Sequence, residues 1–94
     1  MMKIDHEEAE KKGTIFIEEN GEKLAELAYS RSAHGEMTIN HTEVSPKLRG
    51  EGIGQDMVAA AVKFARENSL KIKATCPYAK KLIDSTPEYK DILA

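Results

Sequence analysis

The chain has 94 residues, of which 40% are hydrophobic and 32% are charged, so it can form one modest hydrophobic core. Fourteen basic and sixteen acidic residues give a net charge of −2, which argues against nucleic acid as the partner. No run of eighteen apolar residues occurs, and the polar segment 1–12 has no apolar signal sequence. With a single cysteine, which cannot form an internal disulfide, these features predict one cytoplasmic domain over residues 1–94 and no membrane association.

Two strands joined by a tight turn are expected after the polar segment. Residues 14–19 alternate in hydrophobicity, with two isoleucines on the same face. Asn20-Gly21 follows, a pair that favours a two-residue hairpin turn because both positions tolerate a positive φ. The second strand covers residues 22–31, where a change of face near residues 25–27 suggests a bulge or a strong twist.

Residues 36–44 predict a third strand that completes an antiparallel meander. Met37, Ile39 and His41 alternate with polar residues and are expected to share one face. Pro46 ends this strand, because proline cannot donate a hydrogen bond to a neighbouring strand.

The second half of the chain predicts a βαβ connection and a second helix. From Gly52 to about Asn68 apolar residues recur at helical spacing, and residues 70–76 form a fourth strand. Pro77 suits the first turn of another helix, and Pro87 ends it. The fold class is therefore α+β, with a small twisted mixed sheet and two helices. Its antiparallel meander is followed by a parallel or splayed pair of strands.

A glycine-rich turn directly precedes the first predicted helix. Gly50, Gly52 and Gly54 remove side chains where the unpaired amides of a helix N-terminus point outward, and Arg49 adds a cation suited to phosphate oxygens. No Gly-Lys-Ser/Thr follows, and Met57 stands where a dinucleotide-binding fingerprint needs glycine or alanine. The turn therefore predicts an anion site of another kind, and a flexible loop with a glycine cap is the alternative.

Other charged or metal-binding patterns are weak. Cys76 and the three histidines lack the spacing of zinc ligands, so no metal site is predicted. A basic group in the second half is not interleaved with aromatic residues and is interpreted as solvated surface, with a nucleic-acid adaptor as the alternative; it comprises Lys71, Lys73, Lys80 and Lys81.

Residues 44–54, VSPKLRGEGIG, resemble the acyl-CoA loop of the GNAT acetyltransferase superfamily, whose core is Arg/Gln-x-x-Gly-x-Gly/Ala. Arg49, Gly52 and Gly54 match that core position by position. The resemblance implies acetyl-CoA as co-substrate, with its pyrophosphate on the loop amides and its pantetheine beside the strand that ends at Val44. The coenzyme-binding residues implied are Val44, Arg49, Gly50, Glu51, Gly52, Ile53, Gly54 and Gln55.

The later stretch CPYAKKLIDSTPEY is similar to a compact GNAT branch, so the likeness covers most of residues 13–92. Full-size GNAT enzymes carry a pair of helices near the N-terminus that helps to build the acceptor site, and this chain has none. The identity of the acceptor amine therefore cannot be inferred by analogy with those enzymes. An open cleft suits a bulky acceptor such as a protein, or a second copy of the chain that closes it as a homodimer.

Four residues are candidates for catalysis. Cys76 precedes the second helix, where a thiol pKa falls and a thiolate can accept the acetyl group; a small buried hydrophobe is the alternative. The resemblance implies Tyr78 as the acid that protonates the coenzyme A thiolate and Glu43 as a base. Packing and a solvated carboxylate are their alternatives. His41 is either a base or a hydrogen-bonded core histidine.

These features predict an acetyl-CoA-dependent N-acetyltransferase of minimal size. The alternative from another class is a module that binds acyl-CoA as a sensor or adaptor without turnover, and the missing acceptor helices motivate it. Free-thiol detection with a panel of amines distinguishes the two, because the module binds coenzyme A without releasing any thiol.

Overall fold

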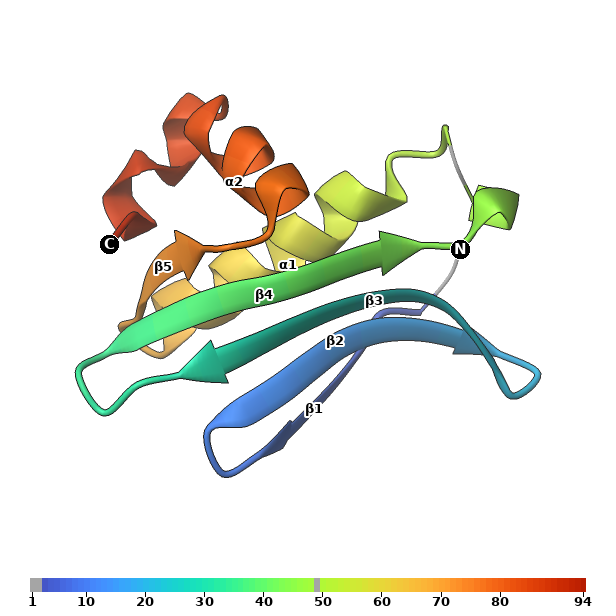
Figure 1. Ribbon diagram of the computed structural model, residues 1–94, viewed down its shortest axis with the longest axis horizontal. Coiled ribbons are helices and arrows are strands. Elements are labelled where there is room, and N and C mark those ends of the chain that lie inside the picture. The colour runs from blue at the N-terminus through green and yellow to red at the C-terminus, as the bar shows by residue number, and fades with distance from the viewer. Residues whose placement is uncertain (1–2, 49) are drawn as a thin grey trace.

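The computed structural model describes residues 3–48 and 50–94 as one α+β fold, which confirms the predicted class (Figure 1). The sheet has five strands in the order β1-β2-β3-β4-β5; the first four are antiparallel, and β5 is parallel to β4. The elements are β1 (Asp5–Ala9), β2 (Lys12–Glu19), β3 (Glu22–Arg31), β4 (Glu36–Val44), the 3-10 helix η1 (Pro46–Leu48), α1 (Ile53–Glu67), β5 (Lys71–Ala74), α2 (Pro77–Asp84) and the 3-10 helix η2 (Pro87–Ile92).

Strand β1 lies within the segment that the sequence suggests is merely polar, so four strands rather than three precede α1. Its inward-facing residues are polar, which hides the strand from hydrophobic periodicity. His6 Nε2 lies 2.5 Å from the hydroxyl of Tyr29, and that hydroxyl donates to Glu8 at 2.8 Å. Arg31 binds the other oxygen of Glu8 at 2.8 Å. These contacts hold β1 onto β3.

The β2–β3 hairpin forms as predicted. Asn20 and Gly21 adopt φ values of 53° and 78° at its turn, which fits a two-residue hairpin connection. The irregularity lies at Leu24, slightly before the predicted position, because Ile17 pairs with Ala25 while Glu18 pairs with Lys23.

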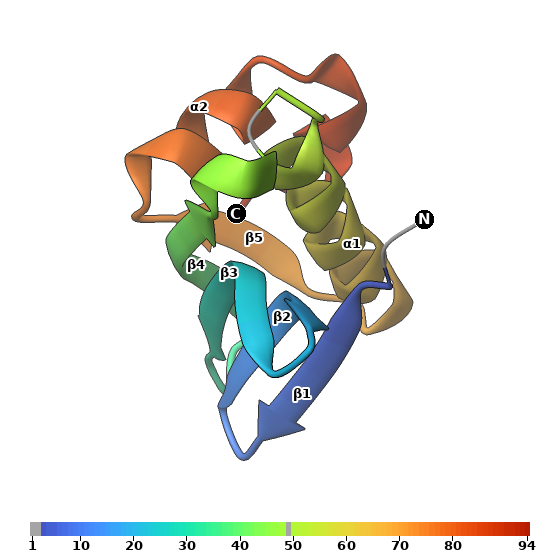
Figure 2. The ribbon, with the colours of Figure 1, turned by 90° about the vertical axis from the view of Figure 1, so that its right-hand side faces the viewer.

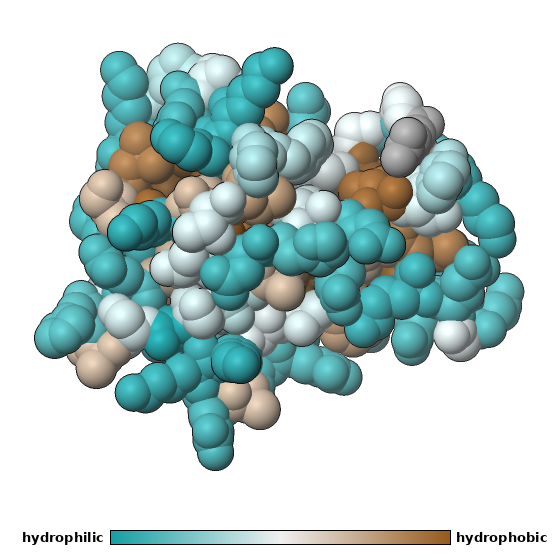
Figure 3. Space-filling model, viewed as in Figure 1, coloured by the Kyte–Doolittle hydropathy of each residue, from teal (hydrophilic) through white to brown (hydrophobic). Residues whose placement is uncertain are grey.

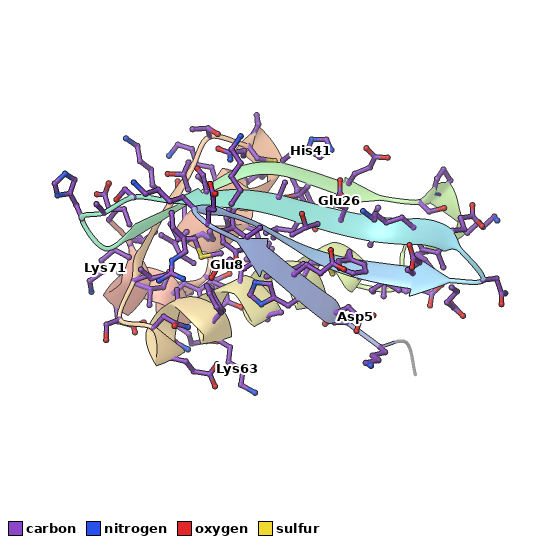
Figure 4. All side chains as sticks on the ribbon, turned by 90° about the horizontal axis from the view of Figure 1, so that it is seen from below. Asp5, Glu8, Glu26, His41, Lys63 and Lys71 are labelled. Carbon is purple, nitrogen blue, oxygen red and sulfur yellow. The ribbon has the colours of Figure 1, made fainter. Side chains whose placement is uncertain are left out.

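A second bulge, in β4, corrects the predicted position of His41. Ala28 pairs with His41 and Tyr29 with Ile39, so Asn40 has no partner on β3. The extra residue shifts the alternation, because each residue inserted into a strand exchanges the two faces beyond it. His41 therefore does not share a face with Met37 and Ile39. Its side chain is exposed, on the side of the sheet away from α1 (Figure 4).

Helix α1 lies across one face of the sheet, here called the inner face, and α2 lies beside β4 and β5 (Figures 1 and 2). Met57 and Ala61 of the predicted apolar stripe are fully buried. They pack in one core with the inner-face residues Ile15, Leu27 and Ile39. The opposite side of the sheet is called the outer face.

Strand β5 pairs in parallel along its whole length, but only with the first half of β4, and the two segments separate beyond Ile39. Pairing runs from Glu36 with Lys71 to Ile39 with Ala74. The carbonyl of Ile39 then accepts hydrogen bonds from the backbone N–H of Thr75 and of Cys76, at 3.0 and 3.3 Å, and the chain turns into α2. Beyond Ile39, β4 therefore has an open edge.

The Tyr29 hydroxyl gives the fold a dependence on alkaline pH. Burial raises the pKa of Tyr29 well above its usual range, and the bond to Glu8 and the charge of Glu8 raise it further. A group with a raised folded pKa stabilises the fold fully below its unfolded pKa of about 10 and loses that contribution above it. We expect the free energy of unfolding to fall by up to about 1.4 kcal/mol per pH unit above pH 10.

Urea unfolding of the parent and of Tyr29→Phe at several pH values checks this expectation. At pH 7 the variant is less stable by about 1–3 kcal/mol, because Glu8 and His6 lose their shared partner. Above pH 10 the two curves converge. Parallel curves over the whole range would show that Tyr29 does not carry the alkaline transition.

Candidate functional site

Two glycines of the turn before α1 are required by their backbone conformation. Gly50 and Gly52 have φ values of +85° and +73°, in the left-handed region that side chains disfavour. Gly52 is the N-cap of α1, and no side chain of a described residue caps the helix. The first amides of α1 therefore point outward without a helical partner, which is the arrangement that binds anions.

At Gly54 glycine is required by close packing rather than by the backbone conformation. A Cβ atom at this position would collide with the hydroxyl of Tyr78 and would lie 2.8 Å from the ring carbon that bears it. Gly54 thus allows the ring of Tyr78, at the start of α2, to lie against the first turn of α1. Tyr78 is nevertheless 48% exposed, so its ring forms a wall at the surface between the two helices.

A pocket of about 500 Å³ lies between the glycine turn, the open edge of β4 and Tyr78. Apolar surface gathers beside this turn, at the right of Figure 3. The structure brings together six of the predicted coenzyme-binding residues here; Glu51 is exposed and does not line the pocket, and Arg49 lies outside the described residues. The lining residues are Thr42, Val44, Leu48, Gly50, Gly52, Ile53, Gly54, Gln55 and Tyr78.

The edge of β4 offers free backbone groups to this pocket. The N–H of Ser45 donates to Leu24 of β3 at 2.7 Å. Because successive residues of a strand direct their backbone groups to opposite sides, those of Val44 and Thr42 face away from β3. They face the gap between β4 and α2, where an extended ligand can add strand-like hydrogen bonds.

Cys76 closes the far end of this gap. It is the N-cap of α2 with Pro77 at the first helical position, and it is 9% exposed. Burial raises the pKa of its thiol, but polar groups that face the sulfur outweigh burial, so the pKa lies below its usual value. The groups that favour the ionised sulfur are the backbone N–H of Ala79, the side chain of Thr42 and the backbone N–H groups of Tyr78 and Thr42. The sequence also predicts a lowered thiol pKa at this position.

Glu43 and His41 lie apart from Cys76. The ring Nε2 of His41 is 3.2 Å from a carboxylate oxygen of Glu43, and both side chains are largely exposed. Figure 4 shows His41 on the outer face, whereas the pocket lies on the side of α1. The site therefore divides into a pocket lined by Thr42 and Tyr78, with Cys76 next to Thr42 but outside that lining, and an outer His41–Glu43 pair across β4.

Sequence reasoning missed Thr42 and Leu48 as pocket residues. Without the bulge at Asn40, Thr42 is expected on the outer face, and no local signal in the sequence marks that bulge. Leu48 lies in the short helix η1 and is buried, which its place in a loop does not suggest.

Within residues 3–48 and 50–94, no helix combines the length and apolar character needed to cross a membrane. Over the same residues, no three or more His, Cys, Asp or Glu side chains gather into a group that could hold a metal ion.

Comparison with known proteins identifies the class that this fold and pocket define. The family model for the GCN5-related N-acetyltransferase matches residues 14–92, and the chain belongs to that family. Protein NATD1 of Homo sapiens is 30% identical over 87 residues, which cover 92% of this chain and 75% of NATD1.

Two solved structures show the same fold. A GCN5-like protein from Staphylococcus aureus is 36% identical, with a TM-score of 0.73 over 96% of this chain and 87% of that one. The ribosomal-protein-S18-alanine N-acetyltransferase from Escherichia coli is 16% identical, with a TM-score of 0.68 over 83% and 53% of the two chains, and shows the fold alone. The resemblance to GNAT enzymes is thus confirmed.

Proposed function

We propose that the protein is an acetyl-CoA-dependent N-acetyltransferase whose coenzyme occupies the pocket between the glycine turn and β4. The pyrophosphate binds the outward amides of residues 50–55, and the exposed Glu51 contributes only its backbone. Pantetheine extends along the backbone groups of Val44 and the carbonyl of Thr42, whose N–H faces the Cys76 sulfur, and the thioester reaches Cys76. The continuity of the pocket from the anion site to the edge of β4 beside Cys76 is the observation that carries this proposal.

The lowered pKa of Cys76 supports a covalent relay. The Cys76 thiolate attacks the thioester carbonyl, a bond forms between its sulfur and the acetyl carbon, and the bond to the coenzyme A sulfur breaks. The coenzyme leaves as a thiolate and takes up a proton. A neutral amine then attacks the acetyl-cysteine, the amide bond forms, the amine loses a proton, and the Cys76 thiolate is released.

A direct attack by the amine is the competing mechanism. In that case the outer pair of His41 and Glu43 accepts the proton of an amine that approaches across the open edge of β4. Tyr78 donates a proton to the departing coenzyme A thiolate. The structure places the Tyr78 ring in the wall of the pocket, but its hydroxyl lies against Gly54 at the anion-binding end.

The lack of an enclosed acceptor site among the described elements supports a second candidate function, a module that binds acyl-CoA without turnover. From Asp5 to Val44 the strands β1 to β4 follow one another without a helix, so this part of the chain supplies no helical pair to enclose an acceptor. A protein acceptor, or a second copy of the chain, would supply that enclosure.

Coenzyme A release measured with a thiol reagent, over a panel of small amines and lysine-containing peptides, tests the proposal. The acetyltransferase releases one thiol for each acetylated amine, and mass spectrometry identifies the product. Tight binding of acetyl-CoA without thiol release from any acceptor, at any protein concentration, would contradict it and favour the binding module.

A further inference from the structure

The hydroxyl of Thr42 is buried without a hydrogen-bond partner, which is rare for a polar group in a protein interior. Its oxygen is buried and makes no hydrogen bond with any residue that the structure describes, and it alone has this property among the side-chain oxygens and nitrogens of those residues. Burying a hydroxyl without a partner is unfavourable, because its hydrogen bonds to water are lost. Such a group inside a pocket therefore needs an explanation.

Thr42 reaches this position through the bulge in β4. The extra residue Asn40 turns Thr42 to the inner face, where it pairs with Leu27 and lines the pocket. Its neighbour there is the sulfur of Cys76, which also faces the amides of Tyr78 and Ala79 across the gap. The sulfur is thus enclosed by donors from two elements, β4 and α2.

The protonation state of the sulfur decides what the hydroxyl can do. A neutral thiol is a weak acceptor, whereas a thiolate is charged and accepts strong hydrogen bonds. The Thr42 hydroxyl therefore gains a partner when Cys76 ionises. The lowered pKa of Cys76, to which the Thr42 side chain contributes, agrees with this coupling.

We propose that Thr42 is a positioning residue: its hydroxyl donates a hydrogen bond to the sulfur of Cys76 when that sulfur ionises, and so fixes the sulfur at the end of the pocket beside β4. This inference deepens the proposed relay and rests on it for its role in catalysis. The proposed hydrogen bond forms whenever Cys76 ionises, with or without coenzyme, so it can be tested separately.

The test compares Thr42→Val, which keeps the shape and loses the hydroxyl, with Thr42→Ser, which keeps the hydroxyl. The rate of Cys76 alkylation by iodoacetamide is measured as a function of pH. Removing a donor to the thiolate raises the thiol pKa. We expect the midpoint for Thr42→Val to rise by about one pH unit, with roughly tenfold slower alkylation at pH 7. The rates converge at alkaline pH, and Thr42→Ser returns the profile toward that of the parent.

Thermal unfolding gives a second readout, in which stability should increase although the reactivity of the cysteine decreases. Because Thr42→Val removes an unpaired buried hydroxyl, its melting temperature should rise while its cysteine becomes less reactive. The matched control is Thr38→Val, on the outer face of the same strand, which should leave the alkylation profile unchanged. Thr38 faces Ser30 and Lys73 rather than the sulfur.

An unchanged profile for Thr42→Val would overturn the inference, as would a Thr42→Ser profile equal to that of Thr42→Val. A Thr42→Val protein with an unchanged profile and a lower melting temperature would show that the hydroxyl is satisfied within the fold. The shifted profile together with a failure to bind acetyl-CoA would leave the role of Thr42 intact and would refute the proposed function instead.

Discussion

Replacing Gly52 by valine should remove acetyl-CoA binding, with an affinity loss of more than about 100-fold, or about 2.8 kcal/mol. The left-handed φ of Gly52 costs a side chain about 1–2 kcal/mol, and the strain changes the direction of the first amides of α1. Each charge-assisted hydrogen bond to the pyrophosphate contributes about 1.5–3 kcal/mol, so the loss of one or two is sufficient. Isothermal titration calorimetry with acetyl-CoA measures the effect.

Gly21→Val is the matched control for this substitution. Gly21 has a similar φ of +78° at the β2–β3 turn, and a Cβ there meets nothing within 4 Å. Both variants should therefore lose comparable stability, but only Gly52→Val should lose affinity. Equal affinities in the two variants would remove the glycine turn from the binding site. Gly54→Val is less informative, because it also displaces Tyr78.

Replacing Cys76 should have the largest effect on turnover if the relay operates. We expect Cys76→Ala to retain acetyl-CoA binding and to lose activity by at least about 10²-fold, because it removes the nucleophile. In the absence of an acceptor, intact-protein mass spectrometry of the parent should show the gain of one acetyl group, and peptide mapping should place it on Cys76.

The direct mechanism makes the opposite prediction for the same protein. Cys76→Ala would then remain nearly as active as the parent, and no acetyl-protein would accumulate. His41→Ala and Glu43→Gln would instead reduce the rate, because the amine would lose the outer pair as its base. This result would assign Cys76 to packing at the start of α2.

The parts of the fold that the sequence predicts are those with local chemical signals. Asn20-Gly21 determines the turn of the hairpin by its tolerance of positive φ, and Pro77 begins α2 because it needs no N–H partner there. The glycine turn likewise carries a local signal, and it lines the pocket in which we propose that the coenzyme binds. Each of these signals depends on the conformation of one or two neighbouring residues.

The parts that sequence reasoning missed depend on contacts between distant segments. Strand β1 is held by His6 and Glu8, whose partner Tyr29 lies two strands away in the chain. The need for Gly54 comes from Tyr78, which another helix supplies. Neither requirement is visible in the neighbouring residues.

The bulge at Asn40 had the greatest consequence for the site. By exchanging the faces of β4, it moves His41 outward and brings Thr42 to Cys76. A strand pattern read with strict alternation assigns both residues to the wrong side. Bulges are common next to active sites. A polar residue near the end of a predicted strand can therefore lie on either face of the sheet, whatever the strict alternation predicts.

The central claim, that an acyl-CoA lies between the glycine turn and the open edge of β4, is tested most directly by an amide-resolved NMR titration with acetyl-CoA. The predicted result is a saturable set of shifts in residues 50–55, Thr42, Val44 and Cys76, with the β2–β3 turn around Gly21 unchanged. Saturable shifts confined to the outer face around His41 and Glu43, or no saturable shifts at millimolar acetyl-CoA, would contradict it.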